Sequence, residues 1–493
     1  RKLTLPIWVP TFPYKKLDNE IMPHRYPKDI NILWVSDFRS IRVPIGMHDE
    51  DRLRHIYVVG KTGVGKSKFL SSMLIDDLKQ GRGMGLIDPH GDLIEEIFMH
   101  IPKERRKDVI VFDPTDEAFP FCLNPLDVGQ DESKQILAKG FIDIFKKFFG
   151  TNWNPKLEHV LRMVFLALLD KKDATLFDII RALTDKDFHY DMIEDINDDV
   201  VRNFWTNEFA WWSQQFNTEA IMPILNKVGQ LLSVDILKNI FSSTENKLDF
   251  RKVMDEKKIL LIKLPKGKLQ EEIMWFLWAM FVTKIFQAAM SRQSLPKEQR
   301  VPFFLYVDEF QNFATDSFST ILSEARKYKL NLVMANQYID QMTETVRGAV
   351  FGNVGTLVSF QVGHHDSAIL AEAFAWDIEA DDLMNQKKYT IYLKQLIDGM
   401  PSPIFSAATF PPHARDDQEF AERYEKILQV SRERYSKPRK LVEEKINKTM
   451  SDIEKQEEEW EKKKEEFKIQ KEEEKRQKNQ ERMEAKKKES EKK

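Results

Sequence analysis

The feature that most constrains the fold is a glycine-rich run between an apolar stretch and a helical one. Residues 60–67 read GKTGVGKS and match the pattern GxxxxGK[ST] at every fixed position. Residues 55–59 before the run are apolar and strand-like, and residues 66–79 have the pattern of a helix. Strand, loop and helix in this order are the context in which the pattern forms a phosphate-binding loop. The sequence therefore predicts an α/β fold built around such a loop.

This loop predicts binding of ATP with Mg²⁺. Its glycines let successive backbone N–H groups point at the β-phosphate, and the N-terminus of the helix adds its dipole. Lys66 can reach the β- and γ-phosphates, and Ser67 can ligate Mg²⁺. The predicted nucleotide-binding residues are Gly60, Lys61, Thr62, Gly63, Val64, Gly65, Lys66 and Ser67.

The second half of the site is predicted at the end of another apolar strand. Residues 303–307 are apolar and are followed by Asp308 and Glu309. We expect Asp308 to hold Mg²⁺ through water and Glu309 to polarise a water that attacks the γ-phosphate. Such a pair favours a hydrolysing motor over a small-molecule kinase. Lys66 and Asp308 lie 242 positions apart, and we expect the two strands that precede them to be neighbours in the sheet.

Two further residues are catalytic candidates beside Lys66 and Glu309. Gln337 follows the next apolar strand, at residues 331–335. Its amide can sense the γ-phosphate or orient water, and a bond to a loop is the alternative. Arg326 lies on the helix between Asp308 and that strand. It either stabilises the C-terminus of that helix as a cation or acts as an arginine finger on a neighbouring subunit's ATP.

Three other patterns are less specific. Residues 88–92 (DPHGD) are compatible with a metal site or a role in hydrolysis, but turn chemistry explains them equally well. Residues 364–366 (HHD) look like a helix start capped by the aspartate, with a metal site as the alternative. Trp205, Trp211 and Trp212 could stack nucleic-acid bases, although their spacing is more typical of a core.

Strand and helix patterns alternate along the chain, with one interruption. Residues 130–250 show only helical patterns. This order predicts a mainly parallel sheet interrupted by an inserted all-helical domain. Strands are expected at residues 31–35, 40–45, 55–59, 85–87, 109–112, 259–264, 303–307, 331–334 and 356–361.

The predicted domains follow from these patterns. They are an extended arm at residues 1–29, the ATPase domain at 30–129 and 251–415, the helical insert at 130–250, a connecting helix at 416–440, and a charged tail at 441–493. The tail contains 17 basic and 17 acidic residues. Ile446, Ile453, Trp460 and Phe467 are spaced by sevens. A solvated single helix, a weak coiled coil and a partner-binding tail remain open.

Composition excludes several classes of protein. With 42% apolar residues, the chain is not wholly disordered or fibrous. Its net charge of −3 excludes a strongly basic protein that coats nucleic acid, but not a local basic channel. A lone Cys122 excludes a disulfide framework and fits a reducing cytosol. The uncharged run at residues 273–283 is too short to cross a bilayer, which takes about 20 residues, so it predicts a buried core helix.

Taken together, the motifs resemble those of the HerA/FtsK-like P-loop ATPases, and within them the coupling ATPases of type IV secretion and conjugation. The resemblance covers roughly residues 30–410. Its most specific part is the order of DEFQ, RKY and a strand that ends in Gln. The matching segments are 55–67 (HIYVVGKTGVGKS), 86–92 (LIDPHGD), 259–267 (ILLIKLPKG), 305–311 (LYVDEFQ) and 324–337 (EARKYKLNLVMANQ).

The resemblance implies a RecA-like motor domain with an all-helical insert. It implies a ring of six copies that pumps DNA, typically a single strand with a bound relaxase-type protein, towards a secretion channel. Arg326 matches the arginine that acts in trans in the family. Family members often have an N-terminal membrane anchor. We therefore expect a cytoplasmic protein, and the resemblance leaves open whether an anchor upstream of Arg1 holds it at the inner face of the cell membrane.

Two other functions fit the same motifs. The chain could be an ATP-dependent substrate receptor that recruits cargo through its helical insert, with little translocation. It could also be a HerA-like ATPase for DNA processing or packaging. The intact Glu309 favours the motor over the receptor, because a receptor needs no hydrolytic group.

Overall fold

The computed structural model describes residues 30–36, 44–129, 131–209, 217–312, 316–375, 377–410 and 417–448. The chain divides into two compact units, Arg1–Lys437 and Pro438–Lys493. Several predictions lie outside the described residues: the arm at 1–29, the tryptophans Trp211 and Trp212, and most of the heptad positions in the tail.

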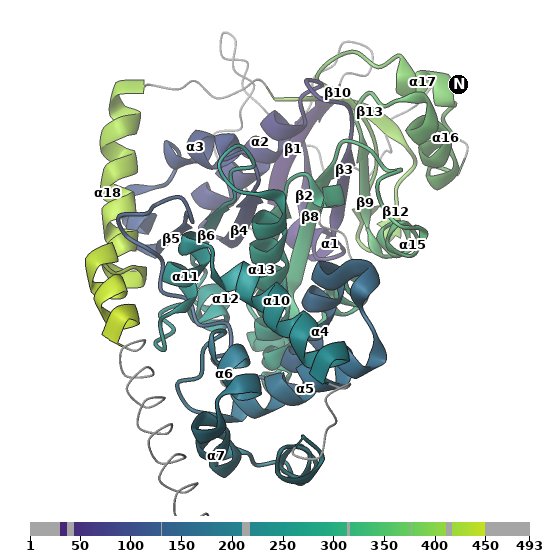
Figure 1. Ribbon diagram of the computed structural model, residues 1–493. Coiled ribbons are helices and arrows are strands. Elements are labelled where there is room, and N and C mark those ends of the chain that lie inside the picture. Colours follow the sequence, from purple (N-terminus) through teal and green to yellow (C-terminus); the bar gives the residue numbers. More distant parts are fainter. Residues whose placement is uncertain are drawn as a thin grey trace, which may run out of the picture. The chain divides into compact units, whose positions relative to one another are not determined.

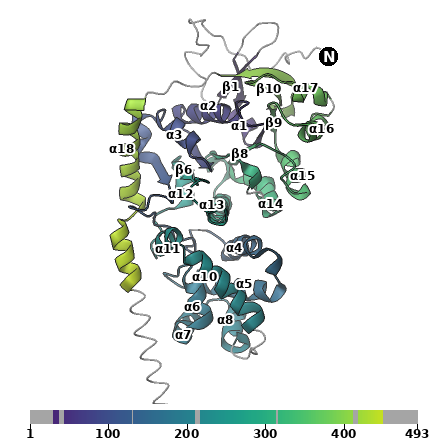
Figure 2. The ribbon, with the colours of Figure 1, turned by 45° about the horizontal axis from the view of Figure 1, so that its top comes forward.

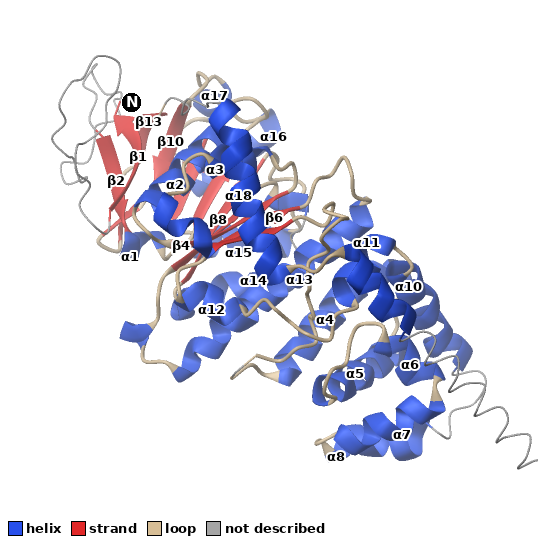
Figure 3. Ribbon diagram, turned by 90° about the vertical axis from the view of Figure 1, so that its left-hand side faces the viewer, coloured by secondary structure: helices blue, strands red, loops and turns tan. Residues whose placement is uncertain are grey.

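The centre of the first unit is an eleven-stranded sheet with the order β2-β1-β13-β10-β9-β3-β8-β7-β4-β6-β5 (Figure 3). The seven strands from β9 to β5 are parallel, and the other four are antiparallel. A small hairpin of β11 and β12 is separate. The strands are β1 Ile30–Ser36, β2 Pro44–His48, β3 Ile56–Val59, β4 Gly83–Asp88, β5 Val109–Phe112, β6 Ile259–Lys263, β7 Phe303–Val307, β8 Leu330–Asn336, β9 Thr356–Ser359, β10 Thr390–Lys394, β11 Leu396–Ile397, β12 Met400–Pro401 and β13 Phe405–Thr409.

The strand order corrects one prediction. The strands that precede Lys66 and Asp308, β3 and β7, are not neighbours, because β8 lies between them and pairs with both. All three are short and buried, and they are apolar except for Asn331 and Asn336 in β8, so their apolar side chains do not distinguish one parallel partner from another. The sequence also failed to predict β10 and β13. These strands begin at Thr390 and Phe405 and extend the parallel sheet by antiparallel pairing.

Helices cover both faces of the parallel strands (Figure 1). Helices α2 and α3 pack with Ile56 and Val58 of β3 on one face. Helices α13, α14 and α15 pack with Tyr57 and Val59 on the other. Buried residues on both faces are what a parallel sheet between helices requires. The bounds are α1 Asp49–Arg52, α2 Lys66–Lys79, α3 Asp92–Phe98, α13 Glu271–Ser291, α14 Asp316–Glu324, α15 Glu344–Asn353, α16 His364–Ala373, α17 Ala380–Met384 and α18 Asp417–Tyr435.

Between β5 and β6 the described residues form helices and no strand, as the sequence predicts. In Figure 2 the helices from α4 to α11 lie below the sheet, and their core is continuous with the face that α13 covers. Phe141 of α4 stacks on Phe165 of α5 with ring centroids 4.9 Å apart. The helices are α4 Lys134–Phe149, α5 Pro155–Asp170, α6 Asp178–Thr184, α7 Lys186–Asp195, α8 Asp199–Asn203, α10 Met222–Leu232, α11 Asp235–Phe241 and α12 Phe250–Asp255.

Helix α13 contains the uncharged run of the sequence. Within the described ranges it is the one unbroken helix that is long and apolar enough to span a membrane. Two helices at 219–232 and 235–241, which meet at a bend, are long and apolar enough only if they are taken together as one span. Of the apolar window in α13, 83% is buried inside the protein. Lys284, which directly follows the uncharged run, is paired with Glu132 at 3.1 Å. The helix thus occupies the core position that the sequence predicts.

Helix α18 covers the β5 edge of the sheet. Ser431 accepts the Val111 N–H at 2.9 Å, and Tyr424 packs on Phe98 with ring centroids 4.8 Å apart. A covered edge cannot pair with another chain. The helix lies within the range predicted as a connecting helix, residues 416–440, whereas the boundaries of the predicted domains stay a prediction.

Acid is expected to destabilise the fold through His55, which joins β3 to β8 and α14. Its Nδ1 accepts the Leu332 N–H at 3.1 Å, so Nε2 carries the proton and donates to Leu322 O at 3.0 Å. Burial lowers the pKa of His55 from 6.5 to about 4. Between these pH values the unfolded chain binds a proton that the folded chain does not, so stability falls as pH falls, by up to about 3 kcal/mol.

The variant His55→Asn tests this, because asparagine tolerates the left-handed φ of 63° at this position. We expect a loss of about 1–3 kcal/mol at pH 7.5 from the broken hydrogen bonds, and a flatter profile between pH 6.5 and 4. Urea unfolding at several pH values measures both. His189, whose pKa is also lowered to about 4, stays in place in both proteins. Parallel pH profiles would show that His55 does not contribute.

Candidate functional site

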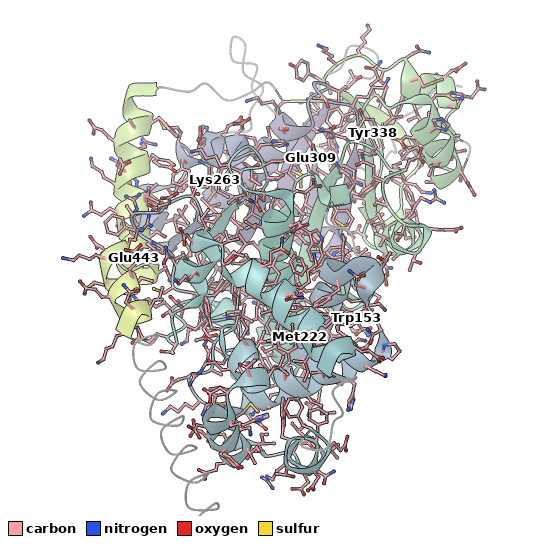
Figure 4. The ribbon with its side chains drawn as sticks, viewed as in Figure 1. Trp153, Met222, Lys263, Glu309, Tyr338 and Glu443 are labelled. Atoms are coloured by element: carbon pink, nitrogen blue, oxygen red, sulfur yellow. The ribbon has the colours of Figure 1, made fainter. Side chains whose placement is uncertain are left out.

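The phosphate-binding loop and the acidic pair meet at the carboxyl-terminal edge of the parallel strands. The loop follows β3, the acidic pair follows β7, and Gln337 follows β8. In Figure 4 the labelled residues Lys263, Glu309 and Tyr338 mark this edge at the ends of β6, β7 and β8. Open parallel sheets bind ligands at this edge, because the loops there converge.

Glycine is required at two positions of the loop. Gly65 has a φ of 117°, which side chains rarely adopt, and an added Cβ would lie 2.8 Å from Cδ1 of Tyr389. An added Cβ on Gly60 would lie 2.5 Å from Cβ of Phe360. The loop is also held by the Lys61 N–H, which donates to Gln361 O at 2.9 Å. Neighbouring strands therefore define the path of the loop.

Lys66 begins helix α2 and is buried, with 7% of its surface exposed. Its Nζ donates to the carbonyl oxygens of Gly60 and Lys61. Burial lowers the pKa of Lys66, while the nearby Glu309 and Asp308 carboxylates oppose that shift. The cation thus lies inside the curve of the loop, where a phosphate can replace the carbonyl oxygens as its partner.

The acidic pair lies opposite the loop. Asp308 and Glu309 are both buried, and Glu309 has a left-handed φ of 50°. An Asp308 oxygen accepts the Glu309 N–H at 3.0 Å. Burial, followed by the charges of Glu309 and Asp88, raises the pKa of Asp308 to about 6. Carboxylates gathered so closely that they raise the pKa of Asp308 are suited to a divalent cation, which Lys66 alone does not replace.

Two amides hold the Glu309 carboxylate. Gln337 Nε2 donates to one oxygen at 2.6 Å, and Gln311 Nε2 donates to the other. Gln337 therefore contacts the acidic pair, while its predicted action on the γ-phosphate or on water stays a prediction. Gln311 was not predicted as a site residue. Its place two residues after Glu309 in the DEFQ segment was the available signal. Both amides fix the direction of the carboxylate.

These groups line one cavity of about 280 Å³. It brings together most of the predicted loop residues, the acidic pair and Gln337. It adds Lys68 and Tyr389, which were not predicted, and His90 from the less specific 88–92 segment. Free N–H groups at the start of α2, a buried lysine and paired carboxylates fit a triphosphate with Mg²⁺. Its lining residues are Thr62, Gly63, Gly65, Lys66, Ser67, Lys68, His90, Asp308, Glu309, Gln337 and Tyr389.

The 88–92 segment forms a turn at this edge. The buried Asp88 carboxylate accepts backbone N–H groups from His90, Leu93 and Ile94 at 2.9–3.1 Å. Asp88 thus holds the start of α3, which is the turn chemistry that the sequence offered as one interpretation. Its charge still acts on Asp308, and His90 lines the cavity.

Residues 364–366 begin helix α16, but the predicted cap is wrong. Asp366 accepts the Ile339 N–H at 3.1 Å and so holds the loop after β8 instead of its own helix. Trp205 is buried with Phe204 and Phe209, so it belongs to the core. Among the residues that the structure describes, no group of three or more His, Cys, Asp or Glu is arranged to hold a metal ion by itself.

Arg326 is not brought to this site. It lies in the 3₁₀ turn Ala325–Tyr328, just before β8, and is exposed. Strand β8 has seven residues, which places the two edges of the sheet about 20 Å apart. Arg326 instead lines a cavity of about 450 Å³ with Arg54 and Lys394 at the amino-terminal edge. Within the described ranges none of these three cations forms an ion pair.

The fold and the site together define a RecA-like P-loop ATPase. The chain belongs to the type IV coupling proteins, since the family described as "Type IV secretion-system coupling protein DNA-binding domain" matches residues 40–384.

One similar protein is the type 4 coupling protein DotL of Legionella pneumophila subsp. pneumophila. The two sequences are 22% identical over 400 residues, which cover 68% of this chain and 51% of DotL. The chain thus spans about half the length of this relative.

Solved structures show the same fold at low sequence identity. The plasmid coupling protein TrwB in complex with the ATP analogue ADPNP has a TM-score of 0.55 and is 15% identical, over 78% of this chain and 90% of TrwB. TrwB in complex with ADP and Mg²⁺ matches over 80% and 92% with the same TM-score. VirB4 of Thermoanaerobacter pseudethanolicus has a TM-score of 0.50 and is 13% identical, over 77% and 96%. These likenesses support the assignment of the fold.

Proposed function

We propose that this chain is an ATP-driven motor that moves DNA, or DNA with a bound protein, towards a type IV secretion or conjugation channel. The observation that carries the proposal is the buried Glu309, held by two amides beside Asp308 and across from Lys66. A protein that only binds nucleotide needs no such oriented carboxylate. The family match, described by its DNA-binding domain, supports DNA as the substrate.

The proposed cofactors are ATP and Mg²⁺. Lys66 would pair with the β- and γ-phosphates, and Ser67 and Asp308 would hold the cation. When bound, Mg²⁺ would neutralise charge on the phosphates. Glu309 would accept a proton from the attacking water, and Gln337 would keep that carboxylate in place. The titles of the TrwB structures, which name ADPNP and ADP with Mg²⁺, support this pair of ligands.

The test is the ATPase rate with no DNA, with single-stranded DNA and with double-stranded DNA, measured together with the oligomeric mass. A motor is expected to hydrolyse ATP faster when DNA is bound, and single-stranded DNA is expected to stimulate more. The ATPase rate of the Glu309→Gln variant, measured in parallel, is subtracted as the background of contaminating ATPases. A rate that neither form of DNA changes would contradict the motor.

A recruitment receptor is the second candidate, and the helical segment between β5 and β6 favours it as a surface for cargo. The receptor would bind ATP and cargo without stimulation by DNA. We propose that this segment is a domain in either case, and that channel and relaxase-type proteins are its partners. DNA processing or packaging shares the ATP site and differs only in the path of the DNA. The proposed place of action is the cytoplasmic face of the membrane that contains the channel.

We propose further that the active unit is a ring of subunits. Variants of Arg326 test this. The ATP site of the same subunit lies at the other edge of the sheet. The cations Arg54, Arg326 and Lys394, which form no ion pair within the described residues, line a cavity that can receive the phosphate of a neighbour's ATP. We expect Arg326→Ala to bind ATP normally but to hydrolyse it about 10³-fold more slowly. Mixed with Lys66→Ala subunits, it should regain activity, because a hybrid interface pairs an intact loop with an intact finger.

The measurement is ATPase rate against mixing ratio, with DNA present. Lys327→Ala is the matched control, because Lys327 is the next cation in the same turn and pairs with Glu324 at 2.7 Å. If the mixture shows no excess over the separate variants, Arg326 acts only as a cation at the end of its helix.

A further inference from the structure

Tyr389 lies at the rim of the phosphate cavity, just before β10. Its backbone is tied to the loop, because the Tyr389 N–H donates to Val64 O at 3.0 Å. Its carbonyl accepts the N–H of Thr409 at 2.9 Å and the hydroxyl of Thr409 at 3.2 Å. Tyr389 thus connects the antiparallel edge of the sheet to the phosphate-binding loop.

A tyrosine is conformationally strained at position 389. Tyr389 has a φ of 65°, in the left-handed region, where an aromatic residue is strained and glycine or asparagine is favoured. Strain of this kind persists where the surroundings hold it and is concentrated at functional sites. We therefore expect the aromatic ring of Tyr389 itself to have a function.

The ring lies against Gly65, since an added Cβ on that glycine would be 2.8 Å from Cδ1 and 3.3 Å from Cε1. The residue remains 49% exposed. It lines the same cavity as Ser67 and Lys68, the second and third residues of helix α2. Within the described part of the chain, no other aromatic ring stacks on it. An aromatic surface is therefore available beside the phosphate cradle.

We propose that Tyr389 stacks on the base of the bound nucleoside triphosphate, an inference that rests on the proposed function. Lys66 and the loop amides hold the phosphates, and the base needs an apolar surface next to them. Stacking reads the π-face that every base has and not its hydrogen-bonding edge. Tyr389 therefore adds affinity for the nucleoside without choosing between adenine and guanine.

The experiment compares two ligands on the full chain by calorimetry with Mg²⁺: ATP, and inorganic tripolyphosphate, which has no base. In Tyr389→Asn the affinity for ATP is expected to fall about 5- to 150-fold, the range of one base stacked on one ring, and GTP should lose the same factor. Tripolyphosphate should bind within about twofold of the unchanged chain. Tyr389→Phe keeps the ring and should keep ATP binding.

Folding is checked in the same variants. Since asparagine tolerates a positive φ, nucleotide-free Tyr389→Asn should melt no lower than the unchanged chain. The affinity for ATP is then expected to fall while the melting temperature does not. Tyr190→Asn, at another tyrosine that is 73% exposed, is the control. Equal weakening of ATP and tripolyphosphate would show that Tyr389 only supports the loop and would overturn the inference, as would unchanged ATP binding. Failure of the unchanged chain to bind ATP with Mg²⁺ would overturn the proposed function itself, and this inference with it.

Discussion

Replacing Glu309 with Gln is expected to lower the rate of ATP hydrolysis by a factor of about 10²–10⁴, the usual contribution of a general base. Glutamine has nearly the same shape but cannot accept the proton of the attacking water. Lys66 and Asp308 remain in place, so ATP and Mg²⁺ should still bind. Single-turnover hydrolysis and equilibrium nucleotide binding, measured on the same preparation, separate the two effects.

The fold is expected to survive this change. The Gln337 amide can still donate to the remaining oxygen, and at most one of the two amide contacts of residue 309 is lost. Glu298→Gln is the matched control, because Glu298 is an exposed carboxylate in the turn Lys297–Gln299, away from the site. If turnover of Glu309→Gln stays within about twofold of the unchanged chain, Glu309 has another role.

Replacing Lys66 with Ala is expected to remove tight ATP binding. Loss of one partner of a buried, hydrogen-bonded charge pair costs about 2–5 kcal/mol, which is a factor of about 30 or more in affinity. The variant should therefore lose the rise in melting temperature that saturating ATP gives the unchanged chain. Thermal melts with and without ATP and Mg²⁺ measure this loss.

The nucleotide-free Lys66→Ala protein is expected to be as stable as the unchanged chain. The buried ammonium is paired mainly with two loop carbonyls, and burial disfavours its charge. Lys79→Ala, at the exposed last residue of the same helix, should change neither binding nor stability. Unchanged ATP affinity in Lys66→Ala would remove the glycine-rich loop from the nucleotide site.

Much of the site could be predicted because its chemistry is local. The loop from Gly60 to Ser67 contains both the required glycines and the lysine in eight positions. Asp308 and Glu309 are recognisable because they end a run of buried apolar residues. Gln337 could be suggested for the same reason. All four parts lie at strand ends, and parallel strands bring their carboxyl ends to one edge.

Other features depend on which strands pair, and local sequence does not specify that. Strands β3, β7 and β8 are all buried and mainly apolar, so their apolar pattern lets each pair with either of the others. The insertion of β8 between β3 and β7 places the Gln337 amide 2.6 Å from Glu309. The roles of Asp366 and Tyr389 also depend on residues distant in the chain, Ile339 and Val64.

The sequence by itself determined the phosphate-binding loop, the acidic pair and the buried strands that present them, because each is a short pattern with its own backbone and charge requirements. Only the tertiary structure decided the order of the strands, the two amides on Glu309, the ring of Tyr389 on Gly65, and the place of Arg326 at the opposite edge. The physical reason is that backbone hydrogen bonds between apolar parallel strands are nearly interchangeable. Their order is selected by the packing of the whole core on both faces of the sheet.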